Sequence, residues 1–331
     1  MRTLVILRGV PGCGKSTWVK ENNLEMYTLC ADNLRLLVKS PVLKADGTYG
    51  SVLGEDKYVW GLLHNLLEKR MQNGEFTVID ATHSKINELG IYKQLANKYR
   101  YRVYCVDFSD VPLEVALERN AKRVEYKRVT EYAIKRIHNR LQSEKLTSWI
   151  SVLKPDEFKS VVEWTPTDLS SYEEIVHIGD IHGCVTVLKE YLKDGLNPNK
   201  YYIFLGDYID RGIENKEVID FLMTICELPN VCLLEGNHER HLWAYGNDHA
   251  MSRDLKFCRD TIKELGESSK MKKNARKLCR KLRQLMWYTY KGQEVFCSHG
   301  GVSRLGENPL YIPASILING TGEYELTSTI N

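Results

Sequence analysis

The fold of the first half is decided by one stretch, Gly9-Val10-Pro11-Gly12-Cys13-Gly14-Lys15-Ser16-Thr17. An apolar run precedes it and a segment that can form a helix follows, which is the setting that a phosphate-binding loop requires. The glycines let several backbone N–H groups approach phosphate oxygens. Lys15 would reach the outer phosphates and Ser16 would ligate magnesium, so the loop predicts a site for ATP or another nucleoside triphosphate. The residues expected at this site are Gly9, Gly12, Gly14, Lys15, Ser16 and Thr17.

Length and composition limit the classes of protein to consider. A chain of 331 residues is long for one domain and comfortable for two, and its 43% hydrophobic and 27% charged residues are typical of a globular protein. No apolar run approaches the roughly 20 residues needed to cross a membrane. The nine cysteines are scattered, and the chain begins directly with a strand and a phosphate loop. We therefore expect no signal peptide, no membrane association and a reducing cytoplasm.

Two more strands are expected at residues 26–30 and 76–80, and polar side chains follow both. Asp32 comes where a strand runs into a helix, on the edge at which α/β sheets bind ligands. Its carboxylate could accept the proton of an attacking hydroxyl, and Arg35, one turn later, could grip an acceptor phosphate. The alternative is an N-cap aspartate with a surface arginine. Asp80 could support the magnesium shell, contact the acceptor or cap a helix.

The rest of the first half continues this alternation of strands and helices. Helical patterns at 55–73 and 86–98 and a strand pattern at 101–108 predict a mainly parallel sheet. Arg119 and Arg123 then lie on or just past a further helix. Their spacing places both guanidiniums on one side, which suits a lid over the transferring phosphate. The alternative is a pair of solvated surface arginines.

The first half resembles the polynucleotide 5′-hydroxyl kinases of phages and of bacterial RNA-repair enzymes. The motifs that carry the resemblance are, in order, Gly9 to Thr17, Asp32-x-x-Arg35, Asp80-x-Thr82 and Arg119-Asn120-x-x-Arg123. It implies that Lys15 and Ser16 hold the ATP phosphates and that Asp32 is the general base. It further implies that Arg35 binds the acceptor's 3′-side phosphate and that Arg123 is the lid arginine at the donor.

Two side chains of these motifs, Asp80 and Arg119, are candidates for binding substrate. His83 departs from the resemblance, because related sequences often carry Asn after the Asp-x-Thr pattern, and no role is transferred to it. The irregular stretch 153–172 predicts a linker between a P-loop kinase domain at 1–152 and a second domain at 173–331.

Metal ligands follow four strands of the second half. The loops are 179–183 (Gly-Asp-Ile-His-Gly), 206–212 (Gly-Asp-Tyr-Ile-Asp-Arg-Gly), 236–239 (Gly-Asn-His-Glu) and 298–301 (Ser-His-Gly-Gly). Carboxylates, imidazoles and an amide oxygen suit manganese, iron, zinc or nickel in open octahedral sites. One carboxylate shared by two metals is the arrangement for in-line attack of bound hydroxide on phosphate. Four such loops in series predict a two-metal phosphoesterase.

These loops resemble the calcineurin-like metallophosphoesterases over roughly residues 173–331, which implies an α/β sandwich and manganese as the expected metal. The implied ligands are Asp180 and His182 on the first metal, Asp207 as the bridge, and Asn237 and His299 on the second. The resemblance also implies that His238 protonates the leaving alkoxide, that Asp210 orients it and that Arg211 clamps the phosphate. The split of roles agrees with the chemistry, since a general acid needs a proton to give and cannot be a tightly held ligand.

One expected ligand is missing. The family has a further metal-ligating histidine after the His-Gly-Gly loop, and none of the nine histidines of this chain follows His299. The tail at 317–324 resembles the family region just before that histidine. We therefore expect a fragment truncated at its C-terminus, and the alternative is a degenerate phosphatase.

A basic cluster precedes the last loop. Its members are Lys270, Lys272, Lys273, Arg276, Lys277, Arg280, Lys281 and Arg283. The net charge of the chain is only +3, so a basic surface would be local. The cluster is either a solvated helix face or a track for nucleic acid.

Together the two resemblances imply a polynucleotide kinase-phosphatase of the bacterial and phage RNA-repair type, without a ligase module. Such an enzyme phosphorylates 5′-OH ends with ATP and removes 3′-phosphate or 2′,3′-cyclic phosphate. Its partners would be RNA or DNA ends and a ligase acting downstream, in a bacterial or phage-infected cell. One alternative is a small-molecule or nucleoside kinase fused to a dinucleoside-polyphosphate hydrolase. Another is an active kinase with a catalytically silent phosphatase-like binding domain. The oligomeric state stays open, a homodimer included.

Overall fold

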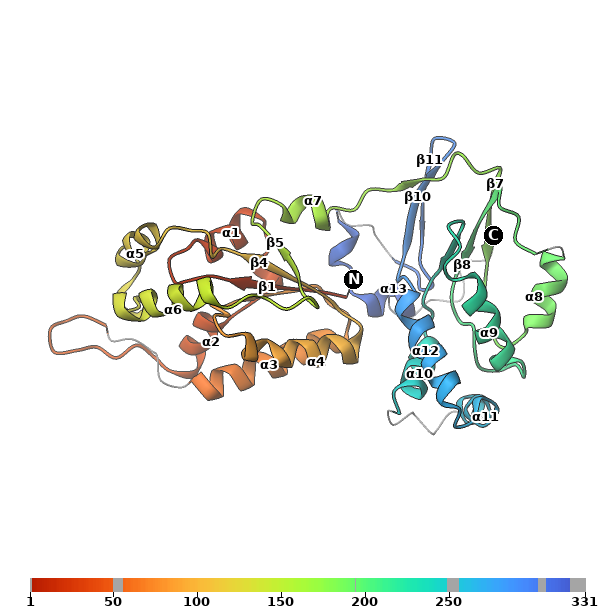
Figure 1. Cartoon of the computed structure of the whole chain (residues 1–331), viewed down its shortest axis with the longest axis horizontal. Coiled ribbons are helices and arrows are strands. Elements are labelled where there is room, and N and C mark those ends of the chain that lie inside the picture. The colour runs from red at the N-terminus through yellow and green to blue at the C-terminus, as the bar shows by residue number, and fades with distance from the viewer. Residues whose placement is uncertain (1, 50–55, 194, 249–255, 303–307, 322–331) are drawn as a thin grey trace. The chain divides into compact units, whose positions relative to one another are not determined.

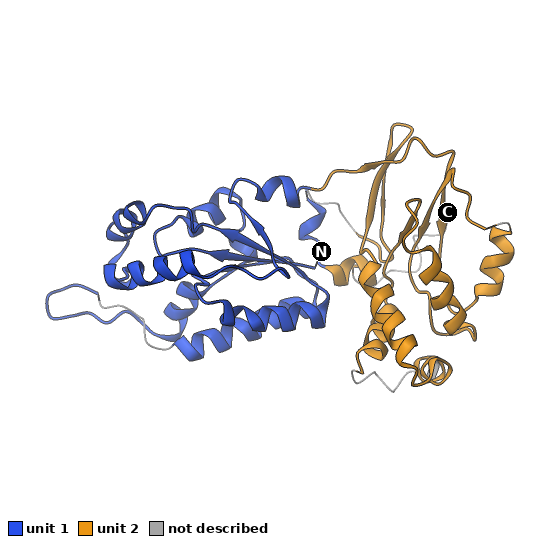
Figure 2. Cartoon of the chain, viewed as in Figure 1, with its two compact units in different colours: residues 1–163, 308–313 blue, residues 164–307, 314–331 orange. Residues whose placement is uncertain are grey.

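The structure of the chain is a computed structural model that describes residues 2–49, 56–193, 195–248, 256–302 and 308–321 (Figure 1). The described residues form two compact units (Figure 2). The first takes in residues 1–163 with 308–313, and the second takes in 164–307 with 314–331. None of the helices within these described ranges is long and apolar enough to cross a membrane.

A parallel sheet of five strands forms the centre of the first unit, in the order β2-β3-β1-β4-β5. All residues of β1 are buried, as expected for a strand covered on both faces. The strands are β1 (Thr3–Arg8), β2 (Thr28–Cys30), β3 (Thr77–Asp80), β4 (Arg102–Asp107) and β5 (Ser151–Leu153). The helices are α1 (Lys15–Glu21), α2 (Ala31–Val38), α3 (Asp56–Gln72), α4 (Gly90–Tyr99), α5 (Leu113–Ala121), α6 (Glu131–Ser143) and α7 (Phe158–Val162).

Helix α3 shows how the sequence pattern produces the packing. Its buried residues are Val59, Leu63, Leu67 and Met71, four residues apart, so they form one face. This face joins the core of the first unit together with side chains of β1 and β3. Burial of each such side chain stabilises the fold by about 1.5–3 kcal/mol. Because this apolar face is fixed against the core, the position of the polar side chains of the helix, such as Asp56 at its first residue, is fixed as well.

The structure differs from the expected linker at 153–172. Strand β5 pairs in parallel with β4, and α7 buries Phe158 against Trp18 with the ring centroids 4.8 Å apart. The indole N–H of Trp18 also donates to the carbonyl of Pro155 at 3.0 Å. These elements are three and five residues long, so they are too short to show a period in the sequence.

Two small sheets form the second unit. The order β7-β8-β9 is parallel, and the order β11-β10-β6 contains one antiparallel pair. The strands are β6 (Thr167–Asp168), β7 (Glu174–Ile178), β8 (Lys200–Phe204), β9 (Val231–Leu233), β10 (Met286–Tyr290) and β11 (Gln293–Cys297). One apolar core contains residues of both sheets, among them Ile203 and Tyr288, as in a sandwich. The predicted α/β fold class of both halves is confirmed.

Helices complete the second unit. They are α8 (Val185–Leu192), α9 (Asn215–Ile225), α10 (Glu239–Gly246), α11 (Lys256–Leu265), α12 (Ser269–Lys281) and α13 (Ala314–Asn319). The larger core of this unit unites residues of β7–β9 with residues of the first five of these helices. The loops that follow β7, β8, β9 and β11 carry the predicted metal ligands. Residues 322–331, which include part of the tail compared with the family, lie outside the described residues.

Candidate active sites

The phosphate loop joins β1 to α1. Gly12 and Gly14 have φ values of +87° and +106°, in the left-handed region that favours glycine. A Cβ atom on Gly12 would stand 2.2 Å from the carbonyl oxygen of Ala116, so this position also requires glycine sterically. The ammonium of Lys15 is buried and donates to the carbonyls of Gly9 and Val10, each at 2.9 Å. The backbone of the loop therefore holds the Lys15 side chain in place.

Ser16 and Asp80 are in direct contact. The Ser16 hydroxyl donates to a carboxylate oxygen of Asp80 at 2.7 Å. Asp80 is the last residue of β3 and pairs with Leu7 of β1, which brings it beside the start of α1. Asp80 is buried, yet its carboxylate belongs to the same cavity as Ser16. A hydroxyl and a carboxylate side by side are oxygen ligands of the kind that magnesium prefers.

Asp32 lies between two arginines. One of its carboxylate oxygens accepts from Arg35 at 2.8 Å, and the other accepts from Arg123 at 3.1 Å. The side chain of Asp32 stays 41% exposed, so it is accessible to a substrate. Arg35 is only 13% exposed and makes a second ion pair with Asp56 at 2.8 Å. The sequence analysis did not identify Asp56, which is far from Arg35 in the chain and meets it only through the packing of α2 on α3.

The two predicted lid arginines are not on one helical face. Helix α5 ends at Ala121, so Arg119 is helical and Arg123 lies in the segment beyond. The amide of Asn120 makes two hydrogen bonds with the backbone of Val129, at 2.8 and 3.1 Å, and thereby closes that segment into a loop. Arg119 and Arg123 nevertheless line the same cavity.

A cavity of about 910 Å³ brings together most of the residues predicted for the kinase site. Of the predicted residues it includes Gly12, Gly14, Lys15, Ser16, Thr17, Asp32, Arg35, Asp80, Arg119 and Arg123. Gly9 does not line it but accepts the hydrogen bond from Lys15. The cavity also includes side chains that the sequence analysis did not single out, notably Asp56, Trp60 and Arg136.

His83 is a buried structural residue. One ring nitrogen, Nδ1, donates to the carbonyl of Leu7 at 2.7 Å, so Nε2 accepts from the hydroxyl of Tyr92 at 2.9 Å. Burial lowers the pKa of His83 to about 4, so the ring is neutral at neutral pH. The residue ties the loop after β3 to β1. It does not line the cavity, so it has no direct access to a substrate there.

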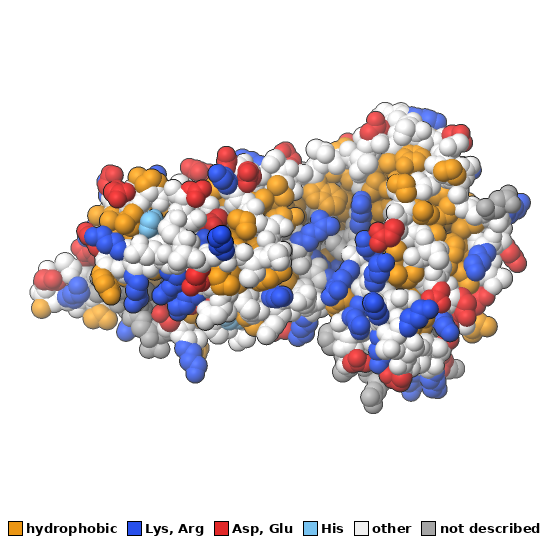
Figure 3. All heavy atoms as spheres, in the orientation of Figure 1, with side chains coloured by type: hydrophobic (Ala, Val, Ile, Leu, Met, Phe, Trp, Pro, Cys, Tyr) orange, Lys and Arg blue, Asp and Glu red, His pale blue; other side chains and the backbone are white. Residues whose placement is uncertain are grey.

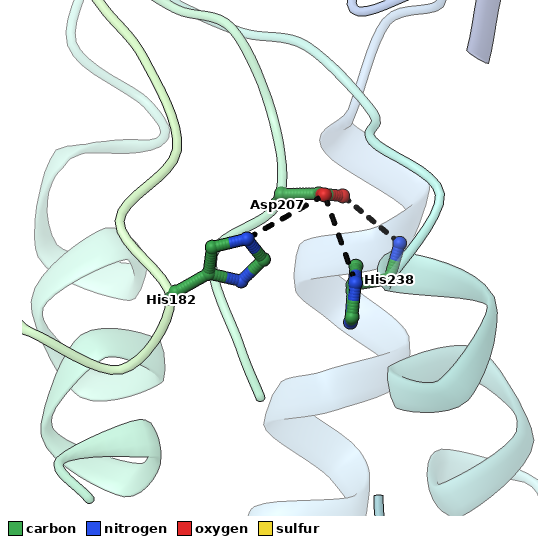
Figure 4. A group of neighbouring side chains, drawn as sticks. All are labelled: His182, Asp207 and His238. Atoms are coloured by element: carbon green, nitrogen blue, oxygen red, sulfur yellow. Dashed lines mark hydrogen bonds and ion pairs between the residues drawn. The ribbon is translucent and has the colours of Figure 1, made fainter. Parts of the chain in front are cut away.

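In the second unit, His182 presents an unpartnered nitrogen to two carboxylates. Its Nδ1 donates to the carbonyl of Ile209 at 3.0 Å, which leaves Nε2 as an acceptor. That atom is buried without a hydrogen-bond partner and lies 3.8 Å from Asp207 (Figure 4). It also lies 3.4 Å from Asp180. A lone pair facing two carboxylates is unfavourable by itself and fits a cation. The residues present therefore suit a divalent metal.

His299 approaches Asp207 from the loop after β11. Its Nδ1 bonds to the carbonyl of Leu205 at 2.9 Å, and its Nε2 lies 3.1 Å from the amide oxygen of Asn237 and 3.4 Å from Asp207. Burial opposes ionisation of Asp207, but hydrogen bonds from His299 and His238 outweigh it and lower the pKa of that carboxyl. Asp207 thus lies between both predicted ligand sets, where a bridging carboxylate is expected.

His238 is held by a buried carboxylate. Its Nδ1 lies 2.7 Å from Asp210, while its Nε2 points toward Asp207 at 3.8 Å (Figure 4). Asp210 is fully buried and also accepts from the hydroxyl of Thr261 at 2.5 Å and the thiol of Cys258 at 3.8 Å. This arrangement fixes the ring and leaves Nε2 directed at Asp207, the predicted bridging carboxylate. Arg211 is exposed, and no described residue forms an ion pair with it.

Glu239 organises the loops and was not identified from the sequence. It is fully buried and accepts from the backbone N–H groups of Asp207, Tyr208 and Gly236 at 3.0, 2.9 and 2.7 Å. Burial raises the pKa of Glu239 to about 7, although the three N–H donors favour its carboxylate form. It therefore connects the loop after β8 to the loop after β9. The only sequence signal is an acid placed directly after Asn-His.

The basic cluster at 270–283 is largely paired with neighbouring groups. Lys272 forms ion pairs with Asp248 and Glu267, and Lys281 forms one with Glu227. Lys and Arg side chains gather on the face of this unit that carries α12, with acidic side chains between them (Figure 3). This pairing favours the interpretation as a solvated helix face over a continuous track for nucleic acid.

Comparisons with known proteins agree with this geometry. Residues 4–144 match the AAA domain family and residues 174–326 match the calcineurin-like phosphoesterase family. The Caenorhabditis elegans protein C27B7.6, a serine/threonine-protein phosphatase by name, is 31% identical over 164 residues, which cover 46% of this chain and 31% of that protein. The serine/threonine-protein phosphatase 4 catalytic subunit of Kluyveromyces lactis is 31% identical over 130 residues, 38% of each chain. The chain thus spans about a third of the length of these curated relatives.

One solved structure is similar over most of the chain. A chain in the structure of the Pnkp1/Rnl/Hen1 RNA repair complex has a TM-score of 0.35 and 18% identity, with 80% of this chain and 84% of that chain covered. A likeness at this level carries no argument about function. The two family matches and the two sites lead to the same conclusion: the chain joins an AAA-type P-loop domain to a calcineurin-like phosphoesterase domain with a candidate site for divalent metal.

Proposed function

We propose that the chain heals nucleic-acid ends by phosphorylating a 5′-OH with ATP and removing a 3′-phosphate or 2′,3′-cyclic phosphate. One observation carries the proposal: Asp32 lies between Arg35 and Arg123 in the cavity of the phosphate loop. A base that activates an acceptor hydroxyl is thereby flanked by two guanidiniums. Such a site favours an acceptor that carries phosphate next to its hydroxyl, as a nucleic-acid end does.

In the kinase reaction Lys15 binds the outer phosphates of ATP, and Ser16 with Asp80 holds the magnesium. Asp32 takes the proton of the 5′-hydroxyl, and Arg35 binds the phosphate on the 3′ side of the acceptor nucleotide. Arg123, on the closed loop beyond α5, stabilises charge on the transferring phosphoryl group, and Arg119 helps to bind the donor. The ion pairs of Asp32, whose side chain is 41% exposed, exchange for contacts with substrate.

In the phosphatase reaction Asp180, His182 and Asp207 would hold one metal, and Asp207, Asn237 and His299 a second, with manganese expected. The bound metals supply Lewis acidity toward phosphate and an activated hydroxide. His238 donates a proton from Nε2 to the leaving alkoxide, and Asp210 keeps the ring in place. Arg211, which is exposed, clamps the phosphate.

The proposal extends to partners and organisation. The products, a 5′-phosphate and a 3′-OH, are the ends that a ligase joins, so a ligase acting downstream in the cytoplasm is the proposed partner. We assign the kinase to residues 1–152 and the phosphatase to 173–331.

Transfer of labelled phosphate tests the kinase assignment. With γ-labelled ATP and magnesium, the chain should label a 5′-OH oligonucleotide and leave a free nucleoside unlabelled. Labelling of the nucleoside alone would favour the small-molecule kinase alternative.

Release of phosphate from a 3′-phosphate oligonucleotide with manganese tests the second half. Hydrolysis of a dinucleoside polyphosphate instead would favour the alternative of a dinucleoside-polyphosphate hydrolase. Release by a longer natural form but not by this chain would favour the fragment. No release by either form would favour the silent binding domain.

A second candidate function rests on the curated relatives, which are serine/threonine-protein phosphatases by name and match over part of their length. The second unit could then hydrolyse a phosphoprotein. A phosphoserine peptide and a 3′-phosphate oligonucleotide, assayed at equal concentration with manganese, distinguish the two. Faster release from the peptide would replace the proposed substrate of the second half.

A further inference from the structure

Trp60 is an aromatic side chain of the kinase cavity that the reaction described above leaves without a role. It lies on α3, four residues after Asp56, so the two side chains share one helical face and both line the cavity. The indole is partly exposed. His64 and His83 pack near it, with ring centroids at 5.8 and 6.0 Å. The indole therefore has neighbouring rings that support it and an accessible surface toward the cavity.

A chain of contacts places this ring beside the acceptor groups. Asp32 contacts Arg35, and Arg35 contacts Asp56, each at 2.8 Å. Trp60 is one turn along α3 from Asp56. Arg119 of α5, by contrast, lies at the phosphate loop, where one of its guanidinium nitrogens would stand 3.4 Å from a Cβ atom on Gly14. The indole thus neighbours the residues assigned to the 5′-hydroxyl and the 3′-side phosphate, which belong to the same nucleotide.

We infer that Trp60 is a stacking platform for the base of the 5′-terminal acceptor nucleotide, a step that rests on the proposed kinase function. Every nucleobase has a π-face, so stacking adds affinity without demanding one sequence. Asp56 belongs to the same acceptor site. Its carboxylate pairs with Arg35 in this structure, and the acceptor phosphate replaces that carboxylate on Arg35 when the substrate binds. The acceptor is then recognised by three features, namely its hydroxyl, its phosphate and its base.

The test compares an ordinary 5′-OH oligonucleotide with one whose 5′-terminal nucleotide is abasic. For the unsubstituted chain, loss of the base should raise the acceptor KM about 10-fold, the usual size of one base–aromatic stack. Trp60→Ala should raise the KM for the ordinary acceptor by the same factor. In this variant the KM values for the ordinary and the abasic acceptor should be equal. Trp60→Phe should retain most of the affinity. The KM for ATP should stay unchanged in both variants.

Tyr58 provides the matched control. It is an aromatic residue on the same helix, 64% exposed, and it does not line the cavity, so Tyr58→Ala should leave the acceptor KM unchanged. Equal KM values for ordinary and abasic acceptors in the unsubstituted chain would overturn the stacking role while leaving the polynucleotide kinase intact. A rise in the KM for ATP with Trp60→Ala would assign the ring to the donor and also overturn it. Failure to phosphorylate any oligonucleotide would instead reject the proposed function.

Discussion

The two candidate sites are built in opposite ways. The kinase cavity is formed by charged side chains that pair with one another on helices and on the loop beyond α5, and Asp32 at its centre is 41% exposed. The phosphoesterase site is formed at strand ends, where Asp207 is 4% exposed and its backbone is bound by the buried Glu239. Exposed ion pairs exchange easily for contacts with substrate, whereas buried hydrogen bonds do not. The first site can adapt to its substrates, and the second is preorganised for metal.

The largest expected effects separate the two chemistries. Lys15→Ala should lower phosphate transfer, and Asp207→Asn should lower phosphatase activity, each by about 10³-fold, because each removes a group on which transition-state charge depends. The activity of the other half should change less than about twofold, since the two sites lie in separate compact units and share no residue. Both are measured with purified full chains. If Asp207→Asn also abolished phosphate transfer, the two sites could not be independent.

Glu239→Gln tests the preorganisation of the second site. The amide would replace one carboxylate oxygen by an NH2 group, which would face at least one of the three backbone N–H donors. We therefore expect the affinity for manganese to fall about 10–100-fold, as for other groups that support metal ligands. Isothermal titration with manganese measures this. Glu227→Gln, which removes surface ion pairs with Lys277 and Lys281, is the control. Unchanged affinity in Glu239→Gln would contradict the role assigned to that carboxylate.

His83 makes the first unit sensitive to acid. The pKa of His83 is about 4 in the folded chain and about 6.5 when unfolded, so the unfolded state binds more protons between these values and stability falls as the pH drops through them. Between pH 7 and pH 5 the free energy of unfolding should fall by about 2 kcal/mol from this residue alone. His83→Gln should remove that part of the pH dependence, as measured by urea unfolding at both values. An equal fall in variant and parent would show that other groups are responsible.

The smallest expected effect concerns the support of His238. Thr261→Val removes one hydrogen bond to Asp210, and we expect the phosphatase kcat to fall about fivefold with KM unchanged, in line with the loss of about 1 kcal/mol. Thr224→Val removes a hydroxyl whose hydrogen bond to the carbonyl of Phe221 lies on an exposed helix end, and it should leave kcat unchanged. A change in KM instead of kcat would place Thr261 in substrate binding.

The sequence allowed much of both sites to be predicted, because phosphate loops and strand-end ligand loops are local signals. Gly12, Lys15 and Asp207 could be identified from their immediate neighbours. The supporting contacts could not, because they join residues far apart in the chain: Arg35 meets Asp56 through helix packing, and Glu239 reaches the loop after β8. Burial and hydrogen-bond partners are properties of the folded chain that no local pattern carries.

The mass of a single oligonucleotide reports on both candidate sites at once. An oligonucleotide with a 5′-OH and a 3′-phosphate is incubated with the full chain, ATP, magnesium and manganese, and its mass is followed. We expect Asp207→Asn to yield a product heavier by one phosphate, since only the 5′ end is modified. Lys15→Ala should yield one lighter by one phosphate, since only the 3′ end is modified. An oligonucleotide that keeps its mass with both variants, under conditions where a nucleoside or a phosphopeptide reacts, would contradict the account.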